Sequence, residues 1–410
     1  MTSALQANEK VHIIAYNSTE QTRITNLLTA ANVPLTNVDF KIFQTNDVWV
    51  RDNGPIYVRN ASGNLVIQDW GFNGWGGDYN FSKCNPIPTK IATATGTPVL
   101  NLNSVMTVEG GSFEMDGHGV FLATKSAILS QSNPSSQIYS IRNAGMTVAQ
   151  ANAIFTQYVG VSKFYWLEGA FSNDDITDFH IDGFAKFAPN NKLVTMSQAD
   201  LLYWGVTQAD INMLFGMTNA NNVAYTKVFL PLTQNNVSKT DGTDLGYKGS
   251  YANYYVANSR VLVPNYNDPN DAAANAIIAG LYPGRTAVGI DVRNLYGNGG
   301  MVHCVTQQQP MATFVNTEKA ENSKATRFNI YPNPAQNNAD IVLNLQENAT
   351  LKIDIYTVTG MKIIEIGSKY YTIGKNTIPL NTTNLPNGTY ICQITGENTT
   401  FESQKFVVAK

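Results

Sequence analysis

The sequence predicts two domains of different class, an α/β domain followed by a small all-β sandwich. The chain of 410 residues is long enough for both. Up to residue 315, strand-like runs alternate with amphipathic helices, and after residue 327 only short alternating runs remain. Residues 316–327 between them are polar and lack an apolar period. We therefore expect an α/β domain at 1–315, a linker at 316–327 and a β-sandwich domain at 328–410.

Strand–helix–strand units follow one another in the first domain. A strand at Val11–Tyr16 precedes Ser18-Thr-Glu-Gln21, a predicted capping box, and a helix with Ile24, Leu27 and Leu28 on one face. Periodicity alone does not decide whether such units close into a ring or form an open sheet. The later elements are a strand at Val38–Phe43, helices beginning at Thr147 and Thr207, a helix at Asp271–Gly280 and a strand near Val288–Val292.

The second domain carries the pattern of a β-sandwich. Turn residues such as Thr359-Gly360 and Pro386-Asn-Gly388 separate short runs of alternating character. The predicted strands are Ala339–Leu345, Leu351–Tyr356, Lys362–Ile366, Asn376–Leu380, Gly388–Ile394 and Phe401–Val408.

Composition excludes several classes of function. Apolar content of 43% and charged content of 14% are typical of a folded globular protein, and the net charge of −3 argues against a nucleic-acid partner. No apolar run is long enough for a transmembrane helix. Three distant cysteines and four histidines without an HExxH pattern predict neither a disulfide framework nor a metal site, and nucleotide-binding loops are absent from the sequence, so no cofactor is expected.

Four stretches of the first domain combine glycine with residues able to do chemistry. Glycine allows the turns that bring such side chains together, and catalytic groups concentrate on such loops. The stretches are Trp49-Val-Arg-Asp52-Asn-Gly-Pro55, Glu109-Gly-Gly-Ser112, His180-Ile-Asp182-Gly183 and Asn298-Gly-Gly-Met-Val-His-Cys304.

Each of these residues also has a plain structural interpretation. Cys304 alone would more often be a buried core cysteine, and Asp52 and Glu109 could be turn carboxylates. His180 and Asp182 are two apart, which on a strand places both side chains on one face. His303 is adjacent to Cys304, so on a strand it would point to the opposite face, and we interpret it as structural.

Taken together, the four stretches favour chemistry on a planar cation. A cysteine nucleophile needs a base or acid, for which His180 is the best candidate, and Glu109 could orient that histidine. Asp52 and Asp182 would make the pocket anionic, which suits a guanidinium whose N–H donors match carboxylates. Trp49 could offer a flat face to the cation.

The same stretches, in order, resemble the agmatine deiminase and Porphyromonas-type peptidylarginine deiminase family. Further segments of the resemblance are His180–Phe187, Gly249-Ser-Tyr-Ala-Asn253 and Thr306-Gln-Gln-Gln-Pro310. The resemblance implies a five-bladed pseudo-symmetric α/β propeller, called a pentein, and hydrolysis of a guanidinium to a ureido group and ammonia without a metal or other cofactor. It implies Cys304 as nucleophile, His180 as general acid and base, Asp52 and Asp182 as the guanidinium clamp, Glu109 as support for His180, and Asn253 and Trp49 as pocket lining.

The second domain resembles the C-terminal sorting domain of the type IX secretion system of Bacteroidetes. The segments that carry this resemblance are Phe328–Pro334, Ile355–Gly360, Leu385–Tyr390 and Lys405–Lys410. It implies the secretion machinery as a partner and a secreted or outer-membrane-attached protein. The first residues show no signal peptide, and the opening strand and loop expected of the family are missing, so we expect an N-terminally incomplete copy.

The substrate stays open between agmatine, free arginine and peptidylarginine. Phe72-Asn-Gly-Trp-Gly-Gly77 resembles the agmatine deiminase branch, and no arginine lies between Arg59 and Lys83 to bind a substrate carboxylate. The secretion domain favours a peptide instead. Two rival functions are a cysteine peptidase or amidase using Cys304 and His180, and a secreted guanidinium-binding or adhesive protein without turnover.

Overall fold

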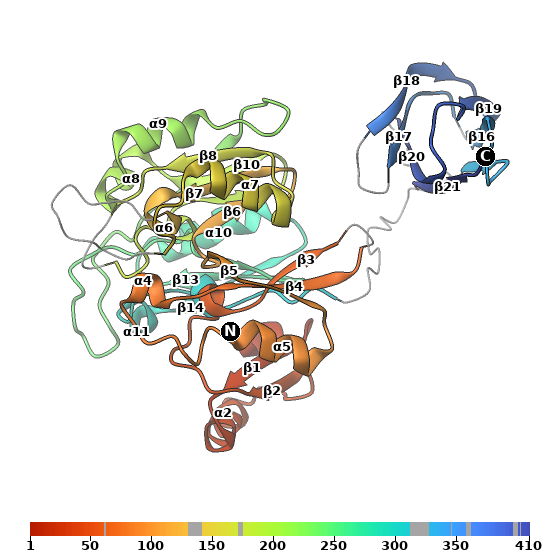
Figure 1. Cartoon of the computed structure of the whole chain (residues 1–410). Coiled ribbons are helices and arrows are strands. Elements are labelled where there is room, and N and C mark those ends of the chain that lie inside the picture. The colour runs from red at the N-terminus through yellow and green to blue at the C-terminus, as the bar shows by residue number, and fades with distance from the viewer. Residues whose placement is uncertain are drawn as a thin grey trace. The chain divides into compact units, whose positions relative to one another are not determined.

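A computed structural model shows two compact units, each of which is described by itself (Figure 1). It describes residues 1–60, 63–129, 142–170, 175–311, 328–345, 347–357, 362–396, 401 and 403–410. Unit 1 consists of Met1–Val58 and Leu65–Pro310, and unit 2 of Arg59–Asn64 and Met311–Lys410. The predicted linker 316–327 and the predicted turn Thr359-Gly360 lie outside the described residues.

Within its described residues, unit 1 contains five small sheets in place of one continuous sheet. One has two parallel strands, and each of the others has three, with a parallel pair made of its second and third strands. The sheets are β1 (Val11–Ala15) with β2 (Val38–Ile42); β3 (Ile56–Arg59), β4 (Leu65–Gly71) and β5 (Val99–Thr107); β6 (Phe113–Met115), β7 (Val120–Thr124) and β8 (Lys163–Leu167); β9 (Lys186–Ala188), β10 (Lys192–Met196) and β11 (Thr226–Leu230); β12 (Tyr255–Val256), β13 (Arg260–Asn265) and β14 (Thr286–Asp291).

Helices connect the parallel strands and bury one face against them, because a parallel pair needs a crossover. Strands β7 and β13 are buried along most of their length, which is typical of strands covered on both faces. The helices of unit 1 are α1 (Thr2–Leu5), α2 (Ser18–Ala30), α3 (Val50–Asn53), α4 (Gly74–Gly77), α5 (Ile87–Thr95), α6 (Lys125–Ile128), α7 (Val148–Val159), α8 (Gln198–Trp204), α9 (Gln208–Gly216), α10 (Asp271–Leu281) and α11 (Arg293–Tyr296), with short 3₁₀ turns η1 (Ile181–Gly183) and η2 (His303–Val305).

Helix ends follow the sequence with one correction. The Thr147 side chain caps α7 and Gln150 completes a capping box, while Thr207 caps α9, as predicted. The capping box predicted at Ser18–Gln21 is wrong, because Asn17 caps α2 by accepting a hydrogen bond from the Glu20 amide. Leu27, predicted to share an apolar helix face with Ile24 and Leu28, is exposed, since α2 covers only one small two-stranded sheet.

A repeated geometry brings four distant segments to one place. The first strands of the three-stranded sheets, β3, β6, β9 and β12, each begin a few residues after a polar segment. These segments are Asp52 in α3, Glu109–Gly111, Asp182 in η1, and Asn253. Helix α3 packs against η2, which carries Cys304, and β6 packs against η1 and β9. Each of the four three-stranded sheets therefore follows one polar segment, and these segments lie at a common centre.

Unit 2 is an all-β pair of sheets with its own core. The alternation of buried and exposed residues along its strands places Ile341, Ile353 and Phe406 in that core. One sheet has the order β15 (Phe328–Tyr331), β16 (Asn338–Leu345), β19 (Gly374–Asn381), and the other β18 (Lys362–Tyr371), β17 (Ala349–Thr357), β20 (Gly388–Gly396), β21 (Gln404–Val408). None of the helices that the structure describes combines the length and the apolar character needed to cross a bilayer.

Candidate active site

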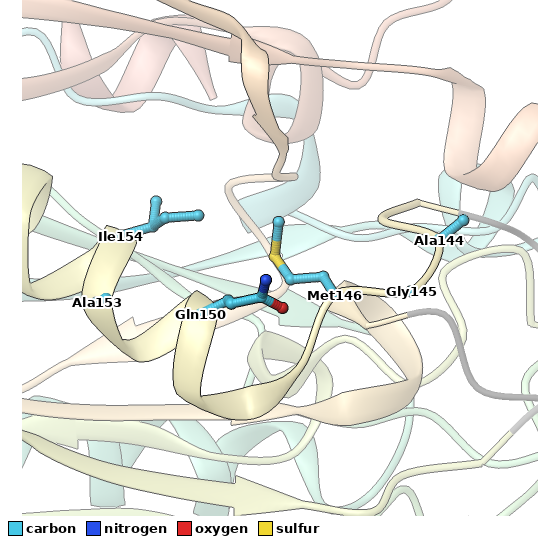
Figure 2. A pocket seen from close by; sticks show the side chains of 6 residues that line it. All are labelled: Ala144, Gly145, Met146, Gln150, Ala153 and Ile154. Carbon is cyan, nitrogen blue, oxygen red and sulfur yellow. The ribbon is translucent and has the colours of Figure 1, made fainter.

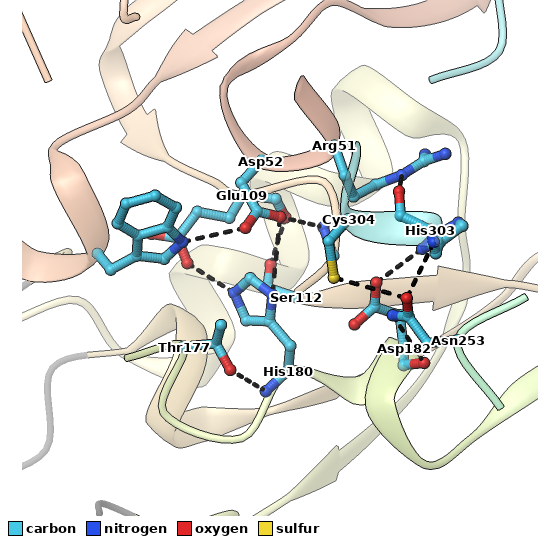
Figure 3. Close-up of polar contacts among 12 residues, drawn as sticks. Arg51, Asp52, Glu109, Ser112, Thr177, His180, Asp182, Asn253, His303 and Cys304 are labelled. Carbon is cyan, nitrogen blue, oxygen red and sulfur yellow. Dashed lines mark hydrogen bonds and ion pairs between the residues drawn. The ribbon is translucent and has the colours of Figure 1, made fainter. Parts of the chain in front are cut away.

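His180 lies between two buried carboxylates at the centre of unit 1 (Figure 3). Its Nε2 is 2.8 Å from Glu109 Oε2, and its Nδ1 is 3.7 Å from Asp52 Oδ1. Burial would lower the pKa of His180, but Asp52, Glu109 and Asp182 outweigh it and raise that pKa to about 9. The ring is therefore an imidazolium at neutral pH and can act as an acid.

Glu109 is held as a carboxylate by a buried arginine. Arg142 Nε donates to both Glu109 oxygens, at 2.8 and 2.9 Å, and its Nη1 donates to Asp178 at 2.6 Å. Burial alone would raise the pKa of Glu109, but Arg142 and His180 lower it below its ordinary value. Glu109 thus stays ionised and directs one oxygen at His180, the position that sequence reasoning expected.

Asp52 receives two hydrogen bonds that fix its carboxylate. The Gly111 amide donates to Oδ1 at 3.1 Å, and Trp75 Nε1 donates to Oδ2 at 3.0 Å. Trp75 has φ of 56° and ψ of 47°, a strained conformation for a residue with a bulky side chain. Burial raises the pKa of Asp52 above its ordinary value, although His180, Trp75 and Gly111 oppose the shift.

Asp182 has an unexpected partner in His303. Its Oδ2 is 2.6 Å from His303 Nδ1, and both side chains are buried. The prediction that His303 points away from the site on a strand is wrong, because Cys304 and His303 lie in the 3₁₀ turn η2. His180 and Asp182 also lie at a 3₁₀ turn, η1, and not on a strand, yet they reach the same centre.

Cys304 is tied to Asn253 and is partly exposed. Its Sγ lies 3.6 Å from Asn253 Oδ1, which also accepts a hydrogen bond from the His303 amide at 2.9 Å. Burial of the sulfur, and then Asp182 and Asp52, raise the pKa of Cys304 well above its ordinary value. Asn253 itself is fully buried, and its hydrogen bonds join the Cys304 segment to the Asp182 backbone.

The glycines beside these residues leave room that no other residue would leave. A Cβ on Gly111 would lie 2.7 Å from His180 Nδ1, 2.9 Å from Asp52 Oδ1 and 3.1 Å from Asp182 Oδ2. A Cβ on Gly300 would lie 2.4 Å from Trp49 Cζ3, so the flat ring of Trp49 packs directly on the chain before Cys304. The imidazolium and the carboxylates of Asp52 and Asp182 therefore converge on one small space above Gly111.

Sequence reasoning missed the cations that surround this centre. Trp75 lies in the glycine-rich stretch Phe72–Gly77, which indicated only a resemblance to the agmatine deiminase branch. No feature of the sequence predicted its hydrogen bond to Asp52. The buried basic residues show no local pattern, since their partners are distant in sequence; they are Arg51, Arg142 and Lys186. Among the described residues, no group of three histidine, cysteine, aspartate or glutamate side chains is arranged to hold a metal ion.

A hollow elsewhere on unit 1 shares no residue with this site (Figure 2). Its lining has no titratable side chain, and consists of Ala144, Gly145, Met146, Gln150, Ala153 and Ile154. We therefore place the chemistry at the buried polar centre and not in this hollow.

The family model for Porphyromonas-type peptidyl-arginine deiminase matches residues 1–310, about three-quarters of the chain. The chain belongs to this deiminase family. It is 32% identical to a candidate agmatine deiminase of Latilactobacillus sakei over 67% of this chain and 78% of that protein. It is 30% identical to the agmatine deiminase of Pseudomonas fluorescens over 68% and 79% of the two chains. The resemblance inferred from the motifs is confirmed, and the protein is a deiminase.

Solved structures and a second family model agree with this assignment. A candidate arginine deiminase from Porphyromonas gingivalis superposes with a TM-score of 0.64 and 28% identity, covering 76% of this chain and 88% of its own. This deiminase therefore shares the pentein fold class of its relatives. Residues 329–409 match a secretion system C-terminal sorting domain, so the chain carries a sorting domain after its catalytic part.

Proposed function

We propose that this deiminase hydrolyses the guanidinium group of agmatine or of an arginyl compound, with Cys304 as the nucleophile. The observation that carries the proposal is the convergence of His180, Asp52 and Asp182 on the space above Gly111, beside Cys304. Two carboxylates around one small space favour a planar cation with several N–H donors. The carboxylates accelerate the reaction only if they stabilise the tetrahedral adduct more than the bound guanidinium.

The free enzyme holds Cys304 as a thiol, because burial and then the charges of Asp182 and Asp52 raise its pKa. A bound guanidinium neutralises those carboxylates and so favours formation of the thiolate beside it. The thiol proton passes to solvent, and sulfur bonds to the guanidinium carbon. His180 then gives its proton to the departing nitrogen, so ammonia leaves, and neutral His180 and a covalent thiouronium cation remain.

Water completes the reaction at the same centre. His180 takes a proton as water attacks the thiouronium carbon, and the C–S bond breaks with return of the thiol. The proton that the thiol released in the first half converts ammonia to ammonium. The sum is guanidinium plus water giving a ureido product plus ammonium, with His180 in its starting state.

Roles for the remaining predicted residues follow from their contacts. Glu109 supports the imidazolium form of His180, and Trp49 supplies an apolar wall next to Gly300. Asn253 holds Cys304 in place through the hydrogen bonds of its side chain. The five small sheets, four of which follow a polar segment of the site, support a five-bladed propeller with the site at its axis.

The proposed domain division is catalytic domain 1–315, linker 316–327 and sorting domain 328–410. The sorting domain supports export of the enzyme by the type IX secretion machinery to the cell surface or beyond. An exported enzyme meets peptides, whereas the relatives named agmatine deiminases act on a small amine, so both substrates belong in the test.

Ammonia release from agmatine, free arginine and peptides with internal or terminal arginine tests the proposal. A ureido product formed together with ammonia is expected from at least one of them. Peptide cleavage without a ureido product would instead establish the rival cysteine peptidase. Binding of these compounds without any turnover would establish the rival guanidinium-binding protein.

A further inference from the structure

The imidazole of His303 contacts the Asp182 carboxylate through one ring nitrogen (Figure 3) and lies near a buried lysine through the other. His303 Nδ1 is 2.6 Å from Asp182 Oδ2, and His303 Nε2 is 3.4 Å from Lys186 Nζ. Lys186 also donates to Glu114 at 2.5 Å. These contacts make an ordered chain from Glu114 through Lys186 and His303 to Asp182.

The chain of contacts fixes the protonation of His303. An ammonium group can only donate, so Nε2 of the ring must accept and the ring proton must lie on Nδ1. His303 then donates to Asp182 Oδ2 as a neutral imidazole. Burial, and then Arg51, Lys186 and His180, lower the pKa of His303 well below its ordinary value, in agreement with the neutral ring.

The hydrogen bond from His303 occupies one oxygen of Asp182 and leaves the other oxygen able to accept from a substrate. Among the described residues, the contacts of the Asp182 side chain include His303 at Oδ2 and no hydrogen bond at Oδ1. The Gly111 position lies 3.1 Å from Oδ2, measured from a Cβ built there. Oδ2 therefore accepts from His303 and also borders the space shared with His180 and Asp52, so His303 fixes the carboxylate at the edge of that space.

His303 is also bound to the segment that carries the nucleophile. Its amide donates to Asn253 Oδ1 at 2.9 Å, and the same oxygen lies 3.6 Å from Cys304 Sγ. Asn253 Nδ2 in turn lies 3.4 Å from the Asp182 carbonyl oxygen. His303 thus links the orientation of the Asp182 carboxylate to the position of the Cys304 sulfur.

We propose that His303 is a positioning residue of the guanidinium clamp, which Lys186 holds in one tautomer so that the Asp182 carboxylate stays turned toward the cation. The inference rests on the proposed function, since it assigns Asp182 to the guanidinium. The inference goes beyond the proposed function by predicting that His303, next to the nucleophile, controls substrate affinity and not proton transfer. Such a residue acts on KM more than on kcat, because it shapes binding of the cation.

Three substitutions at one position test the donor on Asp182. His303→Ala removes the donor, His303→Asn keeps an N–H near the place of Nδ1, and His303→Gln places its amide near Nε2 instead. We expect His303→Ala to raise KM for agmatine or an arginyl substrate by about 10- to 100-fold, the loss of a hydrogen bond to a charged group. We expect His303→Asn to recover most of that loss and His303→Gln little of it.

Methylguanidinium isolates the clamp from the rest of the substrate. Its dissociation constant, measured by calorimetry on the full chain, is expected to rise by the same factor as KM in His303→Ala. Lys186→Met removes the cation that fixes the tautomer and should weaken methylguanidinium binding by a smaller factor. Long-range ¹H–¹⁵N spectra of the wild-type chain should show His303 as the neutral Nδ1–H tautomer at neutral pH.

The outcomes separate this inference from the proposed function. Wild-type KM and wild-type methylguanidinium affinity in His303→Ala would overturn it, as would an imidazolium spectrum of His303. Equal loss in the Ala, Asn and Gln variants, together with a lower melting temperature in each, would also overturn it in favour of a packing role. Wild-type protein that neither releases ammonia nor binds methylguanidinium would overturn the proposed function itself.

Discussion

Cys304 in unit 1 and Cys392 in unit 2 are both cysteines with a raised thiol pKa, yet their surroundings differ in kind. Cys392 lies on β20, fully buried in an apolar core, where burial and then Asp354 raise its pKa to about 12. Cys304 lies on a turn, partly exposed, between the carboxylates Asp52 and Asp182. Burial is the largest cause of the raised pKa of both thiols, but at Cys304 the two carboxylates add to it, and a cation can neutralise their charges.

The charged residues of the two units differ in the same way. In unit 2, Lys362 and Glu365 pair on the surface, with 40% and 47% of their side chains exposed. In unit 1, Glu109 and Arg142 pair with 0% and 1% exposed. Surface pairs contribute little to stability, while buried carboxylates remain only where every one has partners. The buried charge network of unit 1 therefore coincides with the proposed active site, whereas the surface pair of unit 2 is part of no candidate site.

Replacing each cysteine tests this difference most severely. Cys304→Ser should lower kcat by about 10³-fold or more, because a hydroxyl replaces the nucleophile, while methylguanidinium binding is retained. Ammonia release and calorimetry measure the two effects.

Cys392→Ser is the matched control. It should leave kcat unchanged and destabilise unit 2 by about 1–3 kcal/mol, since it places a hydroxyl in an apolar core. Loss of binding in Cys304→Ser would show that Cys304 has a structural role like that of Cys392.

A methyl group placed at the centre of the site should have the next largest effect. The Cβ of Gly111→Ala would lie 2.7 Å from His180 Nδ1 and 2.9 Å from Asp52 Oδ1, so these groups must move. We expect kcat/KM to fall by about 10²-fold, the cost of a misplacement near 1 Å.

Gly216→Ala provides the control, because a Cβ at Gly216 meets nothing within 4 Å and its φ is not positive. It should leave kcat/KM unaltered. Similar losses in both variants would mean that glycine content, and not the space above Gly111, limits activity.

The pH dependence of kcat/KM should reflect two groups of unit 1. Burial raises the pKa of Asp182 to about 6, against the opposing effects of His180, Lys186 and Arg51. Below that pH the carboxylate is protonated and loses its attraction for the guanidinium, so kcat/KM should fall by about tenfold per pH unit. Above about 9, His180 loses the proton that the leaving nitrogen needs.

Glu109→Gln separates these two limbs. It removes a carboxylate that raises the pKa of His180, so the alkaline limb should move to lower pH while the acid limb remains. A profile in which only the acid limb moves would show that Glu109 acts on Asp182 and not on His180.

A core substitution in unit 2 should have the smallest effect on activity. Ile353 is fully buried on β17, and Ile353→Ala should destabilise unit 2 by about 2–5 kcal/mol through the cavity that it leaves. Scanning calorimetry should show the transition of unit 2 at lower temperature, with ammonia release unchanged. Loss of activity in step with loss of stability would show that catalysis depends on unit 2.

Strand and helix patterns foretold much of the fold because they depend on near neighbours in sequence. Thr147 and Thr207 cap their helices as expected, and β1 covers most of the predicted Val11–Tyr16 strand. One prediction failed because two adjacent residues, Asn17 and Ser18, could each cap α2, and Asn17 does so. Likewise, the assumption of a strand at Asp182 and His303 failed because glycine-rich segments form 3₁₀ turns there.

The sequence by itself determined the residue types of the site, its chemistry class and the family, because motifs with glycine, carboxylate, histidine and cysteine stay recognisable without their partners. Only the tertiary structure decided which groups meet. Arg142 holds Glu109 over 33 positions of sequence, and His303 holds Asp182 over 121. Burial then decides their charge, since desolvation and neighbouring ions act through space, and no local pattern encodes either.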